Sequence, residues 1–264
     1  MAVSLRSSRE IELIRRAGCV VADVLSKLSW MAKAGVSTAE LDRTALEMVR
    51  QAGGTALFKG VRSPSSRTRF PGAICVSRNN EVVHGVPSES VVLENGDIVS
   101  IDFGVGLAGY CADAAVTVGV GRVDGEKQRL MDVTREVLGL AMAAARPGVK
   151  WSSIAAAMQH HAESAGFSVV REFVGHGIGK QMHEEPRIPN FVGDEMKDED
   201  FLLAEGMVLA VEPMINAGSS RVRTLGNGWT VVTEDGGCSA HFEHTLAIVE
   251  GGCEILTAGE RNHV

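Results

Sequence analysis

The sequence predicts a mixed α/β (α+β) protein in which a helix–helix–strand unit occurs twice. Three observations indicate this fold class: a globular composition, the order of helical and strand-like segments, and residues that match at one constant spacing. With 264 residues, of which 45% are hydrophobic and 22% charged, the chain has room for one large α/β unit or two small domains.

The first half begins with two helices. The pattern Ser-x-x-Glu at 7–10 is a capping box, and the periodic apolar run after it predicts a long helix to about Ala34. The same pattern at 37–40 opens a second helix, which the glycine pair at 53–54 stops. Strand-like segments then fill about 55–120.

The second half repeats this order. Asp124 starts another long helix, which we expect to end at Arg-Pro-Gly, residues 146–148. Ser152 or Ser153 starts a shorter helix that ends at Gly166, and strand-like segments follow to about residue 257.

Matching residues in the two halves lie 113 positions apart. The pairs are Gly35 and Gly148, Val36 and Val149, Leu41 and Ile154, and Gly53 and Gly166. Shared helix punctuation alone also produces such matches, but no linker-like stretch separates the halves. We therefore expect a single domain, residues 1–264, with pseudo-symmetric halves at about 8–122 and 123–258. A ligand site most naturally lies where such halves meet.

Composition excludes several function classes. The formal net charge of −7 and a pI near 5.6 argue against a nucleic-acid-binding surface as the main function. The five cysteines form no Cys-x-x-Cys pair, which favours free thiols in a reducing compartment. The first residues lack the apolar stretch of a signal peptide, and no uncharged apolar run approaches the ~18 residues of a membrane span. These features predict a cytoplasmic protein with no membrane or specific nucleic-acid partner.

Two aspartates stand in apolar, strand-like sequence at 99–116. Gly106 and Gly109 bracket a dipeptide that suits a tight turn, and a hairpin centred there would place Asp102 directly opposite Asp113. Opposed Cβ atoms lie roughly 4.5–5.5 Å apart, so the two carboxylates would repel unless a cation lay between them. The alternative is a pair of solvent-side acids on an amphipathic hairpin.

Four further polar residues stand in strand-like or glycine-rich sequence. They are His176 and His183 in GHGIGKQMHEEP, Glu212 in VLAVEP, and Glu243 in SAHFEHT. Each one alone is consistent with an ordinary hydrogen-bonded side chain. The glycines lack the spacing of a dinucleotide fingerprint, and His183-Glu184 lacks the second histidine of a zincin site.

Taken together, the set offers four carboxylates and one imidazole: Asp102, Asp113, His176, Glu212 and Glu243. One zinc ion prefers about four ligands rich in nitrogen or sulfur. An oxygen-rich set suits harder divalent ions such as Mn²⁺ or Fe²⁺, with Co²⁺ plausible, and is large enough for two ions. Two ions about 3.5–4 Å apart would share a water and lower its pKa toward neutrality.

The motifs NNEVVHGVP, GDIVSIDFGVGLAGYCADAA, GHGIGKQMHEEP, VEPMINAG and FEHT together resemble those of the type I methionine aminopeptidases of the short bacterial class. The resemblance extends from about Ser8 to Leu256. It implies the pita-bread fold, with two pseudo-symmetric halves around a central antiparallel sheet. It also implies removal of the initiator methionine from new proteins when the second residue is small.

The resemblance assigns the metal ligands residue by residue. Asp102 is similar to the acid that chelates one metal, and Asp113 and Glu243 are similar to the acids that bridge both. His176 and Glu212 resemble the ligands that complete the second metal, with Glu212 also placed to take a proton from the bridging water. The cofactor implied is a pair of divalent ions, whose identity stays open among Co²⁺, Mn²⁺, Fe²⁺ and Zn²⁺.

The resemblance also implies how substrate is held. His84 is similar to the histidine that hydrogen-bonds the substrate near the scissile amide, and His183 to the one that contacts the scissile carbonyl. The methionine pocket is expected from Cys75, Phe70, Met182 and Trp229, although each alone is equally consistent with core packing. Met182 and Arg67 stand at or near positions that are often aromatic in relatives, which leaves the pocket's shape open.

The stretch 58–70 carries Lys59, Arg62, Arg67 and Arg69 and no acid. It is either a solvated loop or a rim that meets the emerging peptide or ribosomal RNA. The partners implied are the N-termini of nascent proteins and peptides, with transient ribosome contact, and the family expectation is a monomer. Two alternatives remain: an Xaa-Pro aminopeptidase of the same fold, and a non-catalytic peptide- or ribosome-binding protein.

Overall fold

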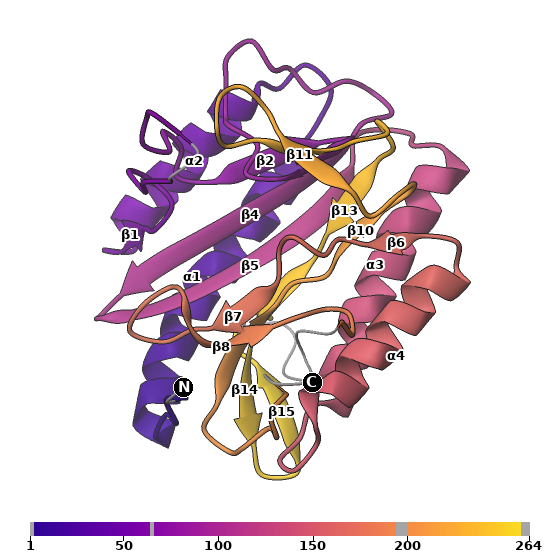
Figure 1. Ribbon diagram of the computed structural model, residues 1–264. Coiled ribbons are helices and arrows are strands. Elements are labelled where there is room, and N and C mark those ends of the chain that lie inside the picture. Colours follow the sequence, from indigo (N-terminus) through magenta and orange to yellow (C-terminus); the bar gives the residue numbers. More distant parts are fainter. Residues whose placement is uncertain (1–2, 64–65, 194–199, 260–264) are drawn as a thin grey trace.

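A curled antiparallel sheet runs through the computed structural model, with pairs of long helices packed against it (Figure 1). The structure describes residues 3–63, 66–193 and 200–259. Within these residues the main sheet has nine strands in the order β1-β4-β5-β14-β9-β7-β8, with β2 beside β4 and β15 beside β14. Two three-stranded sheets, β13-β10-β6 and β11-β12-β3, lie next to it.

The strands of the first half are β1 (Thr55–Ala56), β2 (Cys75–Arg78), β3 (Glu81–Val83), β4 (Ile98–Leu107) and β5 (Tyr110–Gly119). Those of the second half begin with β6 (Ser168–Val169), β7 (Gly175–Gly177), β8 (Glu184–Ile188), β9 (Val208–Val211) and β10 (Met214–Asn216). They end with β11 (Val222–Thr224), β12 (Val231–Thr233), β13 (Ser239–His241), β14 (Glu243–Val249) and β15 (Gly252–Ile255).

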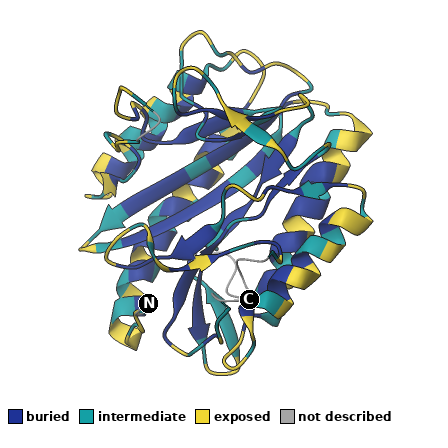
Figure 2. Ribbon diagram, viewed as in Figure 1, coloured by how far each residue is buried: buried dark blue, intermediate teal, exposed yellow. Residues whose placement is uncertain are grey.

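Among the residues that the structure describes, four helices cover the sheet: α1 (Ser8–Met31), α2 (Thr38–Gln51), α3 (Gly125–Ala144) and α4 (Trp151–Ser164). Apolar side chains of α1 and α2 join those of β4 and β5 in one core, and those of α3 and α4 join the second half of the sheet in another. Figure 2 shows the result: the central strands β4, β5, β9 and β14 are largely buried, and the helices expose mainly their outer faces. No helix among the described residues is both long enough and apolar enough to cross a membrane.

The helix starts follow the predicted caps, except in α4. Ser7 and Glu10 form the expected capping box, and Asp124 accepts a hydrogen bond from the Lys127 amide. The last helix begins at Trp151, one residue before the expected serine. A residue outside the helix stabilises this earlier start. The Asp200 carboxylate accepts hydrogen bonds from both the amide and the hydroxyl of Ser152, so this first-turn amide has a partner without a capping serine before it.

The helix ends repeat at the spacing found in the sequence. Adding 113 to the bounds of α2, 38 and 51, gives 151 and 164, the bounds of α4. The matched glycines Gly35 and Gly148 both have positive φ, and their amides donate to the carbonyls of Leu93 and Leu203 respectively. The division into a single domain with halves at 8–122 and 123–258 stays a prediction, with this repeat in its favour.

The β4–β5 hairpin has a different register from the predicted one. Paired residues sum to 217 and not to 215, so Asp102 lies opposite Ala115, and Asp113 lies opposite Gly104. The turn is centred on Ala108 and Gly109, whose φ values of 51° and 84° suit the tight turn that matches strand twist. A shift of two residues leaves both aspartates on the same face of the sheet, as diagonal neighbours.

Candidate metal centre and substrate pocket

Two of the four acidic side chains of the site, Asp102 and Glu243, stand in one row across the sheet. Cys75 on β2 pairs with Asp102 on β4, which pairs with Ala115 on β5, which in turn pairs with Glu243 on β14. Residues paired in this way have side chains on the same face. Between the two acids stands only the small Ala115, so a space remains above the sheet.

The other three groups of the site, Asp113, His176 and Glu212, come from strands β5, β7 and the end of β9. Asp113 lies two residues before Ala115 and therefore shares its face, and its Oδ1 accepts a hydrogen bond of 3.0 Å from the Thr245 hydroxyl. His176 on β7 reaches the same region from the other half of the chain, where it pairs with Ala210 on β9. Glu212 follows the end of β9 directly. Both halves thus contribute ligating groups to one place.

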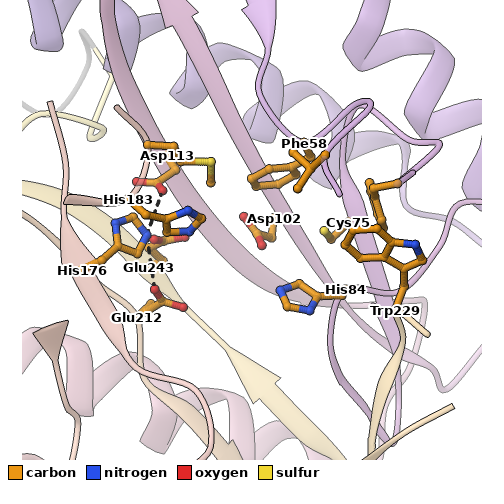
Figure 3. Close-up of a pocket in the computed structure, with 13 residues that line it drawn as sticks. Phe58, Cys75, His84, Asp102, Asp113, His176, His183, Glu212, Trp229 and Glu243 are labelled. Carbon is orange, nitrogen blue, oxygen red and sulfur yellow. Dashed lines mark ion pairs between the residues drawn. The ribbon is translucent and has the colours of Figure 1, made fainter. Parts of the chain in front are cut away.

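These groups converge closely (Figure 3). The Nε2 atom of His176 lies 3.4 Å from Oδ2 of Asp113 and 3.6 Å from Oε1 of Glu212. One ligand atom each from Asp113, His176 and Glu243 lie within 4.8 Å of one another. Asp102 and Glu212 line the same pocket. The five side chains predicted as ligands are therefore brought together.

The tautomer of His176 can be read from its surroundings. Its Nδ1 lies 2.9 Å from the Gly177 carbonyl oxygen, which can only accept a hydrogen bond. Nδ1 therefore carries the proton, and Nε2 presents a lone pair toward Asp113 and Glu212. This is the arrangement that fixes a histidine ligand in metal sites.

The electrostatics of the cluster fit a divalent cation. Burial raises the pKa of Asp113 to about 7, and burial together with neighbouring carboxylates raises the pKa values of Asp102, Glu212 and Glu243 well above their ordinary range. The Oδ2 atom of Asp113 is buried without a hydrogen-bond partner. Four carboxyl groups collected in one buried place repel one another when ionised, and a divalent cation is the partner that removes this cost.

Two further histidines face the pocket. His84 adopts a left-handed backbone conformation, φ 58°, which is rare for a residue with a side chain and is often retained at functional positions. Burial lowers the pKa of His84 to about 4, and burial together with His176 lowers the pKa of His183. Both imidazoles are therefore neutral near pH 7, so each can donate one hydrogen bond and accept another.

The other end of the pocket is apolar. Phe58, Phe70, Cys75 and Trp229 form a small buried cluster with Met182 packed against it. The rings of Phe70 and Trp229 meet edge to face with centroids 5.1 Å apart, and the Trp229 indole donates to the Thr68 carbonyl.

All eleven residues predicted for the site line this pocket, and sequence reasoning missed two others, Phe58 and Val61. Both lie at the start of the basic stretch 58–70, where apolar residues alternate irregularly with charged ones and show no strand or helix period. Arg67 lies outside the pocket and borders a separate hollow with Arg62, Ser66 and Arg69.

Residues 12–250 match the sequence profile of metallopeptidase family M24. The chain belongs to this family. Methionine aminopeptidase 1 of Bacillus subtilis (strain 168) is 46% identical to this M24 peptidase over 252 residues, which cover 96% of this chain and 98% of that protein. The methionine aminopeptidase of Clostridium perfringens is 45% identical over 255 residues, 97% of this chain and 98% of that protein.

Solved structures agree with the sequence comparison. The methionine aminopeptidase of Thermotoga maritima superposes with a TM-score of 0.91 at 39% identity, covering 97% of this chain and 99% of that one. The prolidase of Pyrococcus furiosus, with a TM-score of 0.72 at 22% identity, shares the fold alone. The predicted pita-bread fold and the predicted family are confirmed, and this M24 peptidase is a metal-dependent hydrolase.

Proposed function

We propose that this M24 peptidase removes the N-terminal methionine of new proteins and peptides whose second residue is small. One observation carries the proposal: a short apolar pocket end, lined by sulfur and aromatic groups, lies directly beside a cluster of five ligating side chains. A linear thioether side chain fits such a surface, and its α-amino group would then lie at the carboxylates.

The proposed ligands are the five convergent groups. Asp102, Asp113, His176, Glu212 and Glu243 would together hold the divalent ions. Bound divalent ions would supply a hydroxide near neutral pH and polarise the scissile carbonyl. The number of ions and their identity, Co²⁺, Mn²⁺, Fe²⁺ or Zn²⁺, belong to the proposal, since oxygen-rich ligands alone do not select one metal.

Three residues of the chain would move or hold protons. Glu212, whose pKa burial raises, would accept a proton from the attacking water and pass it to the leaving amine. His84, neutral and on the apolar side of the carboxylates in Figure 3, would hydrogen-bond the substrate near the scissile amide. His183 would donate a hydrogen bond to the oxygen on which negative charge develops.

The methionine side chain would be held by Phe58, Phe70, Cys75 and Trp229, with Met182 closing one wall. Met182 stands above Gly104, where an added Cβ would already lie 3.4 Å from the methionine Cε. The absence of a side chain at 104 thus leaves room for the substrate between sheet and wall.

A cytoplasmic location, a monomeric state and transient contact with the ribosome belong to the same proposal. The three arginines around the hollow beside the pocket, Arg62, Arg67 and Arg69, support contact with an emerging chain or with ribosomal RNA.

The test is hydrolysis of Met-Ala-Ser by the purified protein with Mn²⁺, Co²⁺, Fe²⁺ or Zn²⁺, beside Ala-Pro-Ser as the substrate of an Xaa-Pro peptidase. We expect cleavage of the first peptide only, and its loss on chelation. Asp113→Ala and Glu243→Ala should abolish turnover and metal binding while the circular dichroism spectrum is kept. Asp132→Ala, at a half-exposed position on α3, is the matched control. No turnover of Met-Ala-Ser with any of the metals would refute the proposal.

A further inference from the structure

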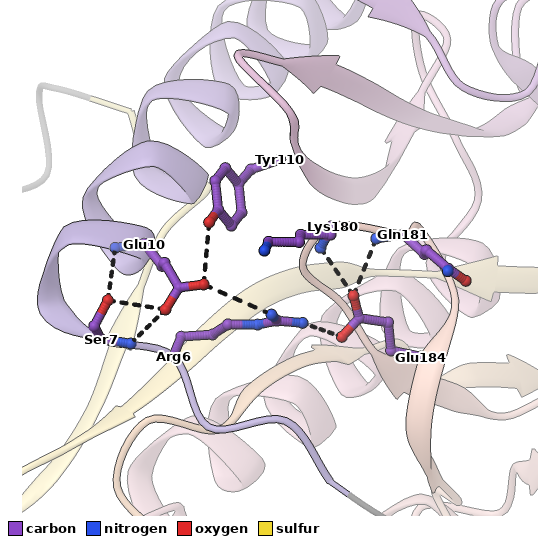
Figure 4. Close-up of polar contacts among 7 residues, drawn as sticks. All are labelled: Arg6, Ser7, Glu10, Tyr110, Lys180, Gln181 and Glu184. Atoms are coloured by element: carbon purple, nitrogen blue, oxygen red, sulfur yellow. Dashed lines mark hydrogen bonds and ion pairs between the residues drawn. The ribbon is translucent and has the colours of Figure 1, made fainter.

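The chain segment before α1 is tied to the loop that carries His183 (Figure 4). The Arg6 amide donates to the Gly206 carbonyl at 2.7 Å, which fixes the backbone of the segment. The Arg6 guanidinium forms an ion pair with Glu184, and only 8% and 15% of the two side chains are exposed. This contact joins residues 178 positions apart in the sequence.

Glu184 in turn closes the loop onto itself. Its Oε1 accepts hydrogen bonds from the amides of Lys180 and Gln181, at 2.8 and 3.0 Å, while its Oε2 faces Arg6. The turn closed in this way carries Met182 and His183, which line the substrate pocket. The position of the loop therefore depends on where the Glu184 carboxylate is held.

Other contacts attach the same junction to the hairpin that bears Asp113. The Cys111 amide donates to the Gly179 carbonyl at 2.7 Å. The Tyr110 hydroxyl donates at 3.0 Å to Glu10, which belongs to the capping box of α1. The second guanidinium nitrogen, Nη1 of Arg6, lies 3.9 Å from the same Glu10 carboxylate. Arg6 thus stands between the start of α1, the hairpin tip and the loop.

Two glycines leave space for Arg6. A Cβ at Gly179 would run into the Arg6 guanidinium, and one at Gly206 would run into the Arg6 backbone. Arg6 Nε is buried without a hydrogen-bond partner. A buried ion pair with an unsatisfied nitrogen is a poor source of stability, because desolvation offsets the attraction. The need to fix the position of the loop therefore explains the Arg6–Glu184 pair better than a gain in folding stability does.

We propose that Arg6 is a positioning residue for catalysis: acting through Glu184, it holds the loop of residues 179–183 so that His183 faces the scissile bond. The expected effect of Arg6 on catalysis rests on the proposed function. The expected effect of Arg6 on the position of the loop does not rest on it. Lysine cannot match the two-sided contact of a guanidinium with Glu184 and Glu10, so it replaces arginine only in part.

The test compares Arg6→Ala and Arg6→Lys in the metal-loaded protein. A misplaced catalytic group can cost on the order of 100-fold in rate, so we expect Arg6→Ala to lower kcat by roughly 10- to 100-fold. Methionine-peptide KM and the number of bound metal ions should change little, and Arg6→Lys should recover part of the loss. Arg15→Ala is the matched control, since Arg15 lies on α1 and bonds Glu12 and Glu254, neither of which belongs to the loop.

A double-mutant cycle with His183→Ala separates positioning from general damage. If Arg6 acts through His183, Arg6→Ala should cost little further activity once the imidazole is gone. An equal loss in both backgrounds, or a loss that only follows the folded or metal-loaded fraction, would overturn the proposal.

Hydrogen exchange of the Lys180 and Gln181 amides gives a readout that needs no substrate. Arg6→Ala should speed their exchange at least about tenfold, whereas Arg15→Ala should not, because these amides donate to the carboxylate that Arg6 holds. Faster exchange in a protein that never cleaves Met-Ala-Ser would sink the proposed function and leave the loop's dependence on Arg6 intact. Unchanged exchange would overturn the inference whatever the activity.

Discussion

Replacing Asp113 by asparagine should stabilise the metal-free protein while destroying metal binding. The ordinary pKa of an aspartate is 3.8, and burial raises that of Asp113 to about 7 in the folded chain. Between these values the folded state binds more protons than the unfolded state. The free energy of unfolding therefore falls as pH rises through this window and levels off above it.

The magnitude follows from the size of the shift. About three pKa units at about 1.4 kcal/mol each give an upper bound of roughly 4 kcal/mol. Asp102, Glu212 and Glu243 also have raised pKa values and share protons with Asp113, so we expect about half of this, ~2 kcal/mol, from one substitution. Asparagine keeps the shape and can still accept the Thr245 hydrogen bond.

The assay is urea unfolding of chelator-treated protein at pH 5 and pH 8, followed by circular dichroism. Asp113→Asn should be more stable than the parent at pH 8, and the difference should be less than half as large at pH 5, because only the part of the window between 3.8 and 5 then remains. Adding Mn²⁺ should stabilise the parent and leave the variant unchanged. Asp132→Asn, at a half-exposed site on α3, should differ from the parent by less than ~0.5 kcal/mol at both pH values. Equal stability of variant and parent at pH 8 would refute the reasoning.

Three other substitutions probe the site and its frame. Gly177→Ala should destabilise the protein by well over ~1 kcal/mol and abolish turnover, because its Cβ would meet backbone atoms of Glu185 and displace His176; thermal unfolding and a metal titration check this. His84→Ala should lower kcat by roughly 10²-fold and leave metal stoichiometry unchanged, as steady-state kinetics with metal analysis would show. Asp124→Ala should cost about 1 kcal/mol through loss of the α3 cap, measured by urea unfolding, with normal kcat per folded molecule.

Local chemistry made much of the fold predictable. The capping box at the start of α1 and the aspartate cap of α3 act over three residues, so they can be read from neighbouring letters. The family motifs likewise named the side chains that line the pocket. The first turn of α4 is instead bonded by Asp200, which is distant in the sequence, so the local pattern predicted a helix start one residue too late.

The sequence by itself determined the helices, the order of the segments and the chemical groups of the site, because short-range hydrogen bonds and residue types set these. Only the tertiary structure decided the hairpin register. The turn is centred on Ala108, which has a positive φ that alanine rarely adopts and that its residue type therefore does not predict. It also decided that Phe58 and Val61 reach the pocket and that Arg6 meets Glu184. Each of these depends on contacts between segments far apart in the chain, and pairing and packing fix such contacts only when the whole sheet has formed.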